Sequence, residues 1–121
     1  MDLQEVMAQR SFAVLGDTVN SEKYAYKIKK GLLDNGYAVY CVGKELSSLN
    51  EITGKIDVID LCINPVKGLE LLRESKKSCK CVVIQPGAES PEIKAFLDEK
   101  KIPYIEGCVL VGLSIYKNYK N

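Results

Sequence analysis

The chain has 121 residues, of which 46% are hydrophobic and 27% charged, and its net charge is +1. These values are typical of a globular domain, and the balanced charge gives no electrostatic basis for broad binding to nucleic acid. No apolar run reaches the roughly 18 residues that a transmembrane helix needs. We therefore expect a single domain over residues 1–121, with neither nucleic acid nor a membrane as partner.

The first ten residues predict a short amphipathic helix, with Leu3, Val6 and Met7 facing inward. They lack the cationic start and apolar core of a signal peptide. The five cysteines are an odd number, and four of them lie in or beside apolar runs, where a free thiol behaves as a small hydrophobe. Reduced thiols without a secretion signal indicate a cytoplasmic location.

The segment from Ser11 to Gly36 predicts a buried strand, a tight turn and a helix. Residues 12–15 form an apolar run without polar alternation, as in a strand covered on both faces. Gly16 ends the run, and a polar loop then offers Asn20 and Ser21 as caps of a helix. The inner side of that helix is predicted to be Tyr24, Ile28, Leu32 and Leu33. A glycine turn before a helix N-terminus suits an anion, so phosphate binding is the first functional hypothesis.

The rest of the chain repeats this alternation of strands and helices. Further strands are predicted at 37–42, 56–63, 79–84 and 102–105, and helices at 46–53 and 66–75. Val66, Leu69 and Leu72 form the expected buried side of the second of these helices. Another helix opens at Ser90 with a serine cap followed by Pro91. Residues 117–121 are expected to be a polar tail.

Strands that alternate with helices at intervals of roughly 20 to 25 residues predict a parallel sheet with right-handed crossovers. We expect an α/β fold, a three-layer Rossmann-like doubly wound sheet of about five parallel strands with helices on both faces. Such sheets bind ligands outside the carboxyl ends of their strands. The loops expected there are 16–21, 43–45, 64–66 and 85–89, which should form one crevice.

Few residues in the sequence favour catalysis. The chain contains no histidine, which excludes a histidine-based triad or imidazole acid–base chemistry. Cys79 and Cys81 have a C-x-C spacing, but they lack the second pair that a zinc site needs, so we interpret them as packing residues. Asp17 and Glu89 are the acids expected near the crevice, and we interpret them as solvated loop residues. No catalytic and no metal-ligating residues are predicted.

Several blocks together resemble the small stand-alone CoA-binding proteins, which are similar to the CoA-binding domain of the succinyl-CoA synthetase α subunit. The blocks are VLGDTVNSEKYAYKI, YAVYCVGKE, IDVIDLCINP, VVIQPGAES and the late GCVLV, and they run in the family order from about Ser11 to Val111. The first block matches the family pattern through Gly16, Thr18, Lys23, Tyr24 and Tyr26, and the fourth through Gln85 and Gly87.

The resemblance implies a non-catalytic protein that binds CoA or an acyl-CoA, with other adenine nucleotides as further candidates. Backbone amides of the first loop and the Thr18 hydroxyl would hold a phosphate, and Lys23 would add charge. Lys44 would be a candidate for a ribose phosphate. Residues 63–65 would line the middle of the crevice, and residues 85–87 would face the pantetheine side. The cofactor-binding residues implied in this way are Gly16, Asp17, Thr18, Lys23, Tyr24, Val42, Gly43, Lys44, Ile63, Asn64, Pro65, Gln85, Pro86 and Gly87.

Two other functions remain open at this point. One is an NAD(P)-binding enzyme or redox sensor, for which Glu45 is the nearest acid to hold a ribose diol, one residue late. The other is a protein-interaction domain that has lost its ligand. It is suggested by Asp17, which replaces a small neutral residue, and by the absence of two family prolines after the second strand. The late apolar residues could form either a homodimer surface or core: Leu110, Leu113, Ile115 and Tyr116.

Overall fold

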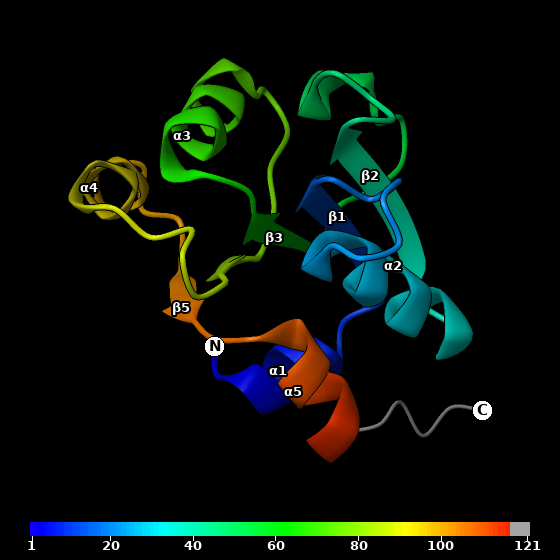
Figure 1. The fold of residues 1–121 in the computed structure, drawn as a ribbon. Coiled ribbons are helices and arrows are strands. Elements are labelled where there is room, and N and C mark those ends of the chain that lie inside the picture. The colour runs from blue at the N-terminus through cyan, green and yellow to red at the C-terminus, as the bar shows by residue number, and fades with distance from the viewer. Residues whose placement is uncertain (117–121) are drawn as a thin grey trace.

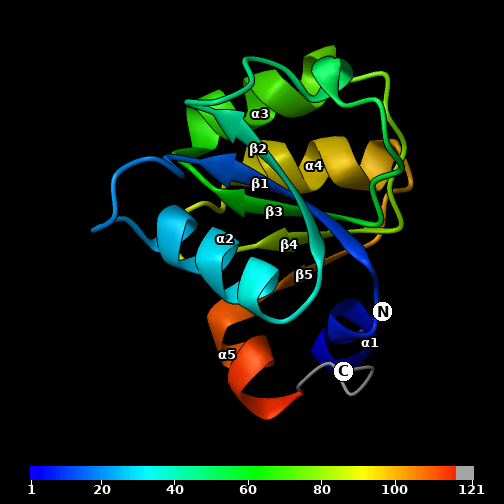
Figure 2. The same cartoon turned by 90° about the vertical axis from the view of Figure 1, so that its right-hand side faces the viewer.

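The protein folds into one parallel five-stranded sheet with helices on both faces, as Figures 1 and 2 show. The computed structural model describes residues 1–116, so the predicted tail at 117–121 lies outside the described residues. The strands are β1 (Ser11–Gly16), β2 (Ala38–Gly43), β3 (Val58–Cys62), β4 (Cys81–Ile84) and β5 (Tyr104–Glu106). Their order across the sheet is β2-β1-β3-β4-β5, and all pairs are parallel. The predicted α/β fold class is confirmed.

The helices divide the core into two layers. They are α1 (Leu3–Met7), α2 (Tyr24–Asp34), α3 (Pro65–Glu74), α4 (Pro91–Glu99) and α5 (Val109–Ile115), with a 3₁₀ turn η1 (Leu49–Glu51). Helices α3 and α4 cover one face of the sheet, and α1, α2 and α5 cover the other (Figure 2). Successive residues of β1 alternate between these layers, since Phe12 and Val14 face α2 while Ala13 and Leu15 face the opposite side. Within residues 1–116 no helix has the length and apolar character that crossing a membrane requires.

Helix α1 closes the edge of the sheet where the strands begin. Its N-cap Asp2 and Glu5 form a capping box, and Val6 and Met7 are buried as predicted. The Tyr37 hydroxyl donates to the Met7 carbonyl oxygen (2.5 Å), and the Tyr37 ring meets Phe12 edge-on, with 5.2 Å between ring centroids. These contacts tie the N-terminal segment to β1 and to the start of β2.

Helix α2 differs from its prediction because it begins later. Asn20 and Ser21 do not cap it: the helix starts at Tyr24, with Lys23 at the N-cap position and no side-chain cap. The buried side is therefore Ala25, Ile28 and Leu32, while Tyr24 and Leu33 are 66% and 50% exposed. Ala25 packs against the end of β1, where its Cβ would lie 2.8 Å from a Cβ added at Gly16.

Helices α3 and α5 also differ from the sequence-based expectation. Val66 was expected on the buried side of α3 but is 80% exposed, and Leu71 packs in the core beside Leu72. Residues 109–115 form α5, a helix that the sequence pattern did not predict. Its Leu113 is buried, whereas Ile115 is 55% exposed. Leu113 therefore belongs to the core.

Candidate nucleotide site at the carboxyl ends of the strands

The loops that follow the strands leave the sheet along one edge, which we call the carboxyl rim. Gly16 is the register partner of both Gly43 and Cys62, so β1, β2 and β3 end at the same level. Ile84 of β4 pairs with Leu61 and with Glu106 in the same direction. Because β1 leads to β2 on one side while β3, β4 and β5 follow on the other, the winding reverses between β1 and β3. Ligands bind at such a switch point in open α/β sheets.

Glycines let the strand ends approach each other at this switch point. A Cβ at Gly16 would overlap the Cys62 carbonyl oxygen and would lie 2.8 Å from the Ala25 Cβ. A Cβ at Gly43 would lie 2.7 Å from the Gly16 carbonyl oxygen. Because Gly16 has no side chain, α2 packs closely on β1 although the first turn of α2 carries Ala25.

The β1–α2 loop is held by its own side chains. The Asp17 carboxylate accepts hydrogen bonds from the amides of Val19 (3.1 Å) and Asn20 (3.0 Å), and the Asn20 side chain accepts one from the Glu22 amide (3.0 Å). The bonds from Asn20 and Val19 lower the pKa of Asp17. These turns use residues 17–22 and explain why the helix begins only at Tyr24.

The β1 and β2 loops are joined by a carboxylate. Glu45 Oε2 accepts a hydrogen bond from the Thr18 hydroxyl (2.6 Å) and pairs with Lys29 Nζ (2.8 Å). Both contacts lower the pKa of Glu45, that from Lys29 more strongly. Thr18 is 1% exposed. The Thr18 hydroxyl was predicted to contact a phosphate, but it donates to Glu45 instead. The sequence had suggested Glu45 only as an acceptor for ribose hydroxyls.

The β3–α3 connection begins a helix at the rim. Asn64 caps α3 by accepting a hydrogen bond from the Lys67 amide (2.9 Å), and Pro65 is the first helical residue. Ile63 is half-buried and packs beside Gly68 of α3. A Cβ added at Gly68 would lie 3.4 Å from the Ile63 Cγ2. The predicted residues of this loop thus lie together at the rim, with the Asn64 oxygen occupied by the helix.

The β4–α4 loop has one buried and two exposed site candidates. Gln85 is 4% exposed, and its Oε1 accepts a hydrogen bond from the Val109 amide (2.8 Å), which supports the start of α5. Pro86 and Gly87 are exposed, and Gly87 has φ +93, a left-handed conformation suited to glycine. The Gly87 amide donates to Glu89 Oε1 (2.8 Å). Asp17 and Glu89 therefore each bond within their own loop, as expected for loop acids.

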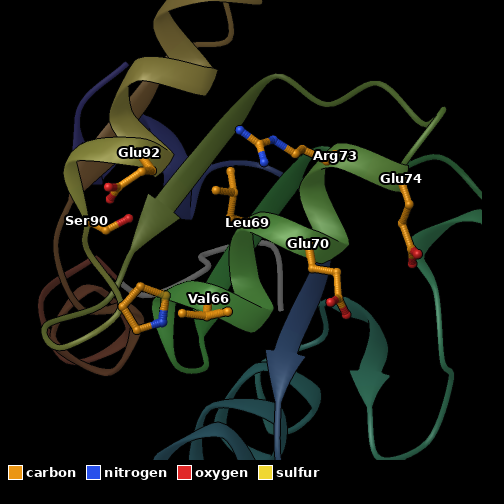
Figure 3. Close-up of a pocket in the computed structure, with 8 residues that line it drawn as sticks. Val66, Leu69, Glu70, Arg73, Glu74, Ser90 and Glu92 are labelled. Carbon is orange, nitrogen blue, oxygen red and sulfur yellow. The ribbon is translucent and has the colours of Figure 1, made fainter.

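Between α3 and α4 lies a cavity of about 570 Å³ that the sequence did not predict (Figure 3). Pro65 and Ser90, which start the two helices, stand at its end nearest the carboxyl rim. Leu69 and Arg73 of α3 and Glu92 of α4 extend it along the helices. Its lining residues are Pro65, Val66, Leu69, Glu70, Arg73, Glu74, Ser90 and Glu92. The sequence did not indicate this cavity, because the amphipathic pattern placed Val66 on the buried side of α3.

The five cysteines are all free thiols. Burial raises the pKa of Cys62 to about 12, with smaller contributions from Asp60 and Cys108. Burial likewise raises the pKa of Cys79 to about 11 and raises that of Cys81. Among residues 1–116 no group of three metal-ligating side chains converges on one point. A thiol with a raised pKa is a poor nucleophile at neutral pH, and this agrees with a packing role for Cys79 and Cys81.

Comparison with known proteins assigns the fold to a family. A conserved hypothetical protein from Pyrococcus furiosus is 31% identical, with a TM-score of 0.75 over 85% of this chain and 98% of that one. A hypothetical protein from Pyrococcus horikoshii OT3 (24% identity, TM-score 0.82, 93% and 87% covered) and a Thermus thermophilus protein (23%, 0.78, 94% and 98%) share the fold. No curated protein matches the chain. The family model described as CoA binding domain matches residues 10–114, so the chain belongs to the CoA-binding domain family.

Proposed function

We propose that the protein binds CoA or an acyl-CoA at the carboxyl rim without catalysing a reaction. The observation that carries this proposal is the meeting of the loops after β1, β2, β3 and β4 at the switch between β1 and β3. Membership of the CoA-binding domain family supports the class of ligand. The absence of histidine and the bonding of Asp17 and Glu89 within their own loops favour binding over acid–base chemistry.

In this proposal the diphosphate lies at the start of α2. The first amides of the helix lack intrahelical acceptors, and Lys23 has no capping side chain, so Tyr24 and the next residues can donate to an anion. Gly16 and Gly43 let the ends of β1, β2 and β3 pack closely together beside these amides. Lys23 supplies a positive charge beside these amides.

The remaining predicted residues take the other parts of the ligand. Lys44 flanks the adenosine after β2, and Ile63 with Pro65 lines the middle of the crevice. Val42, predicted to contact the ligand, lies inside β2 with its side chain 0% exposed, so it supports the crevice from the core instead. Pro86 and Gly87, which are exposed, face the pantetheine side. Gln85 contributes by holding the start of α5 rather than through its side-chain oxygen, which already accepts from Val109.

A second candidate, an NAD-type ligand, is favoured by one observation. Glu45 follows β2 and stands beside the first loop, where dinucleotide-binding sheets place an acid that accepts from ribose hydroxyls. An adenosine diphosphate is common to both candidates, so the same crevice accommodates either.

Calorimetry of the dialysed protein against CoA, acetyl-CoA, NAD, NADP and AMP tests the proposal. Saturable binding by CoA species with no heat from AMP or NADP is the expected result. Lys23→Ala should weaken CoA binding about threefold to tenfold, which corresponds to about 1 kcal/mol. Lys30→Ala is the matched control, because Lys30 lies on the same helix but pairs with Asp34 away from the rim. Absence of binding across the panel would leave the protein-interaction domain as the surviving alternative.

A further inference from the structure

The cavity between α3 and α4 begins at the carboxyl rim. Its end nearest the rim is formed by Pro65, which follows the β3 strand and its loop, and by Ser90, which follows the β4 loop (Figure 3). These are the two loops that the proposed function assigns to the middle of the crevice and to the pantetheine side. A group attached to the thiol end of the pantetheine arm would therefore meet the mouth of this cavity.

The wall of the cavity on α3 is apolar and is left out of the core. Val66 is 80% exposed, and Leu69, which follows three residues later on the same side of the helix, is half-buried. Pro65 adds its ring at the mouth. Hydrocarbon that leaves water for such a surface is stabilised in proportion to the apolar area covered, so the cavity suits a hydrocarbon chain.

Charged side chains border the cavity without closing it. Arg73 extends from α3 toward α4, where Glu92 stands (Figure 3), but among residues 1–116 no ion pair joins the two. The helices are therefore not tied together over the cavity. Side chains of this kind can lay their aliphatic stems along an apolar chain while the charged heads stay in water.

The distance along α3 limits the length of such a chain. From Pro65 to Arg73 the helix advances by about 12 Å, at roughly 1.5 Å per residue. An extended hydrocarbon advances by roughly 1.25 Å per carbon, given C–C bonds of about 1.5 Å that meet at about 111°. We propose that the cavity binds the acyl chain of a medium-chain acyl-CoA, of about eight to ten carbons; this inference rests on the function proposed above.

The test compares ligands that differ only in the length of the acyl chain. In calorimetry of the full chain, octanoyl-CoA should bind at least about tenfold more tightly than acetyl-CoA, equivalent to about 1.4 kcal/mol, with butyryl-CoA between them. Val66→Glu places a charge at the apolar mouth and should reduce this ratio to less than about threefold. Because Val66 is 80% exposed, the variant should fold like the wild type.

Val111→Glu is the matched control. Val111 is also an exposed valine on a helix, with 47% exposure, but it belongs to α5, which covers the opposite face of the sheet. Its ratio of octanoyl-CoA to acetyl-CoA affinity should stay that of the wild type.

The outcomes separate this inference from the proposed function. Equal affinity of the wild type for octanoyl-CoA and acetyl-CoA overturns the acyl site and leaves CoA binding standing. A preference for octanoyl-CoA that Val66→Glu retains, or that Val111→Glu loses equally, also overturns the placement of the chain between α3 and α4. If none of the three ligands binds, the proposed function itself is overturned.

Discussion

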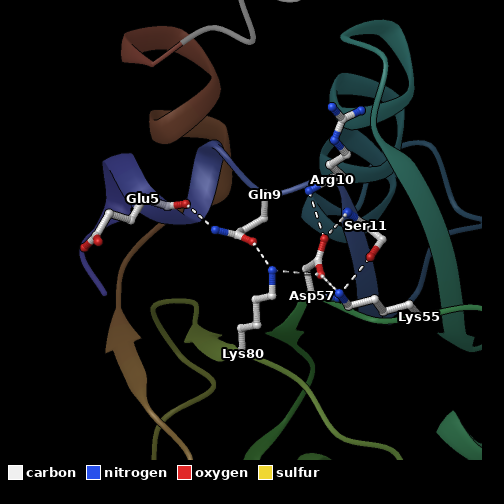
Figure 4. A network of polar contacts seen from close by, with 7 residues as sticks. All are labelled: Glu5, Gln9, Arg10, Ser11, Lys55, Asp57 and Lys80. Atoms are coloured by element: carbon white, nitrogen blue, oxygen red, sulfur yellow. Dashed lines mark hydrogen bonds and ion pairs between the residues drawn. The ribbon is translucent and has the colours of Figure 1, made fainter.

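The two edges of the sheet are built differently. At the edge where the strands begin, here called the amino rim, one buried carboxylate joins segments far apart in sequence (Figure 4). Asp57 Oδ2 accepts from the amides of Arg10 (3.0 Å) and Ser11 (3.2 Å), and its Oδ1 lies 3.6 Å from Lys80 Nζ and 4.0 Å from Lys55 Nζ. The Asp57 amide in turn donates to the Ser11 hydroxyl (3.0 Å). This network fixes β1 against β3.

At the carboxyl rim most polar side chains bond within their own loop, as Asp17, Asn64 and Glu89 do. The contacts between loops are fewer, with Thr18 to Glu45 and Gln85 to Val109 the main ones. Loops that satisfy their own backbone keep their shape without a neighbour. The comparison teaches that a long-range polar network joins β1 to β3 at the amino rim, whereas the loops of the carboxyl rim mostly satisfy their own backbone.

The largest loss of stability is expected from adding a side chain where the strand ends pack together at the carboxyl rim. Gly16→Ala should lower the free energy of unfolding by about 3 kcal/mol, because the new Cβ meets the Cys62 carbonyl and the Ala25 Cβ. Gly107→Ala is the control, since nothing lies within 4 Å of its added Cβ. Urea unfolding measures both. Equal stability of the two variants would contradict the close packing at the switch point.

Removing the carboxylate of the amino rim should have the next largest effect. Asp57→Asn should cost about 2 kcal/mol at neutral pH, because Asp57 is 5% exposed and accepts two backbone hydrogen bonds as an anion. Burial raises the pKa of Asp57, but the Arg10 and Ser11 amides with Lys80 outweigh it and leave the pKa lowered. The stabilisation is therefore present above the unfolded-state pKa and is lost as the pH falls through the folded-state pKa.

The check on Asp57 is thermal unfolding of wild type and Asp57→Asn over a pH series. The gap between the two melting temperatures should be full at pH 7 and shrink from about pH 5 downwards. A gap that stays constant into acid would show that the charge of Asp57 does not hold the amino rim. CoA affinity at neutral pH should be equal in both proteins, since the network lies at the opposite edge.

A buried acid in the middle of β3 should respond to pH in the opposite sense. Asp60 is 0% exposed, neither carboxyl oxygen has a hydrogen-bond partner among the described residues, and burial raises its pKa well above 3.8. The wild type therefore loses stability as the pH rises from the unfolded-state pKa through the folded-state pKa. Asp60→Asn, which cannot ionise, should be more stable than the wild type by on the order of 1 kcal/mol at pH 7, with no gain near pH 3.

Thermal unfolding of Asp60→Asn at the two pH values decides this point. A stability gain that is equal at both would mean that packing rather than ionisation distinguishes the variant. Asp34→Asn, at the exposed end of α2, provides a control in which no comparable dependence is expected.

The smallest effect should come from the outer part of the amino-rim network. Lys80 is 48% exposed and contacts Gln9 and Asp57. Lys80→Met should lower stability by about 0.5 kcal/mol at low salt and less at high salt, as for other exposed ion pairs. A loss that salt does not reduce would indicate that packing of the lysine stem carries the effect.

The sequence predicted the strands and their common edge because both leave local signals. Buried strands appear as apolar runs, and the rim appears as Gly16, Gly43, Asn64-Pro65 and Gly87 after them. Where the prediction failed, the deciding hydrogen bonds were ones that the hydrophobic pattern does not reveal. Helix α2 begins late because Asp17 and Asn20 bond to amides of the loop, and α5 forms where Val109 finds the Gln85 side chain. The apolar, partly β-branched residues of α5 did not indicate a helix in the sequence.

For the site residues, too, the sequence indicated the positions but not the side-chain contacts. The positions that the family pattern implied do lie along one edge, but their side chains carry contacts that spacing does not reveal. The Thr18 hydroxyl meets Glu45, which lies 27 positions later in the chain. Asp60 lies inside β3, which runs from Val58 to Cys62, and the apolar pattern of that strand does not reveal a buried acid.

The most direct test of the account is an NMR titration of the labelled protein with CoA. We predict that amide shifts gather at the carboxyl rim, on Gly16, Gly43, Gly87 and the first turn of α2. The amides of Arg10, Ser11 and Asp57 at the amino rim should stay unchanged. Shifts centred on the amino rim, or none at saturating CoA, would contradict the claim that the carboxyl rim is a nucleotide site.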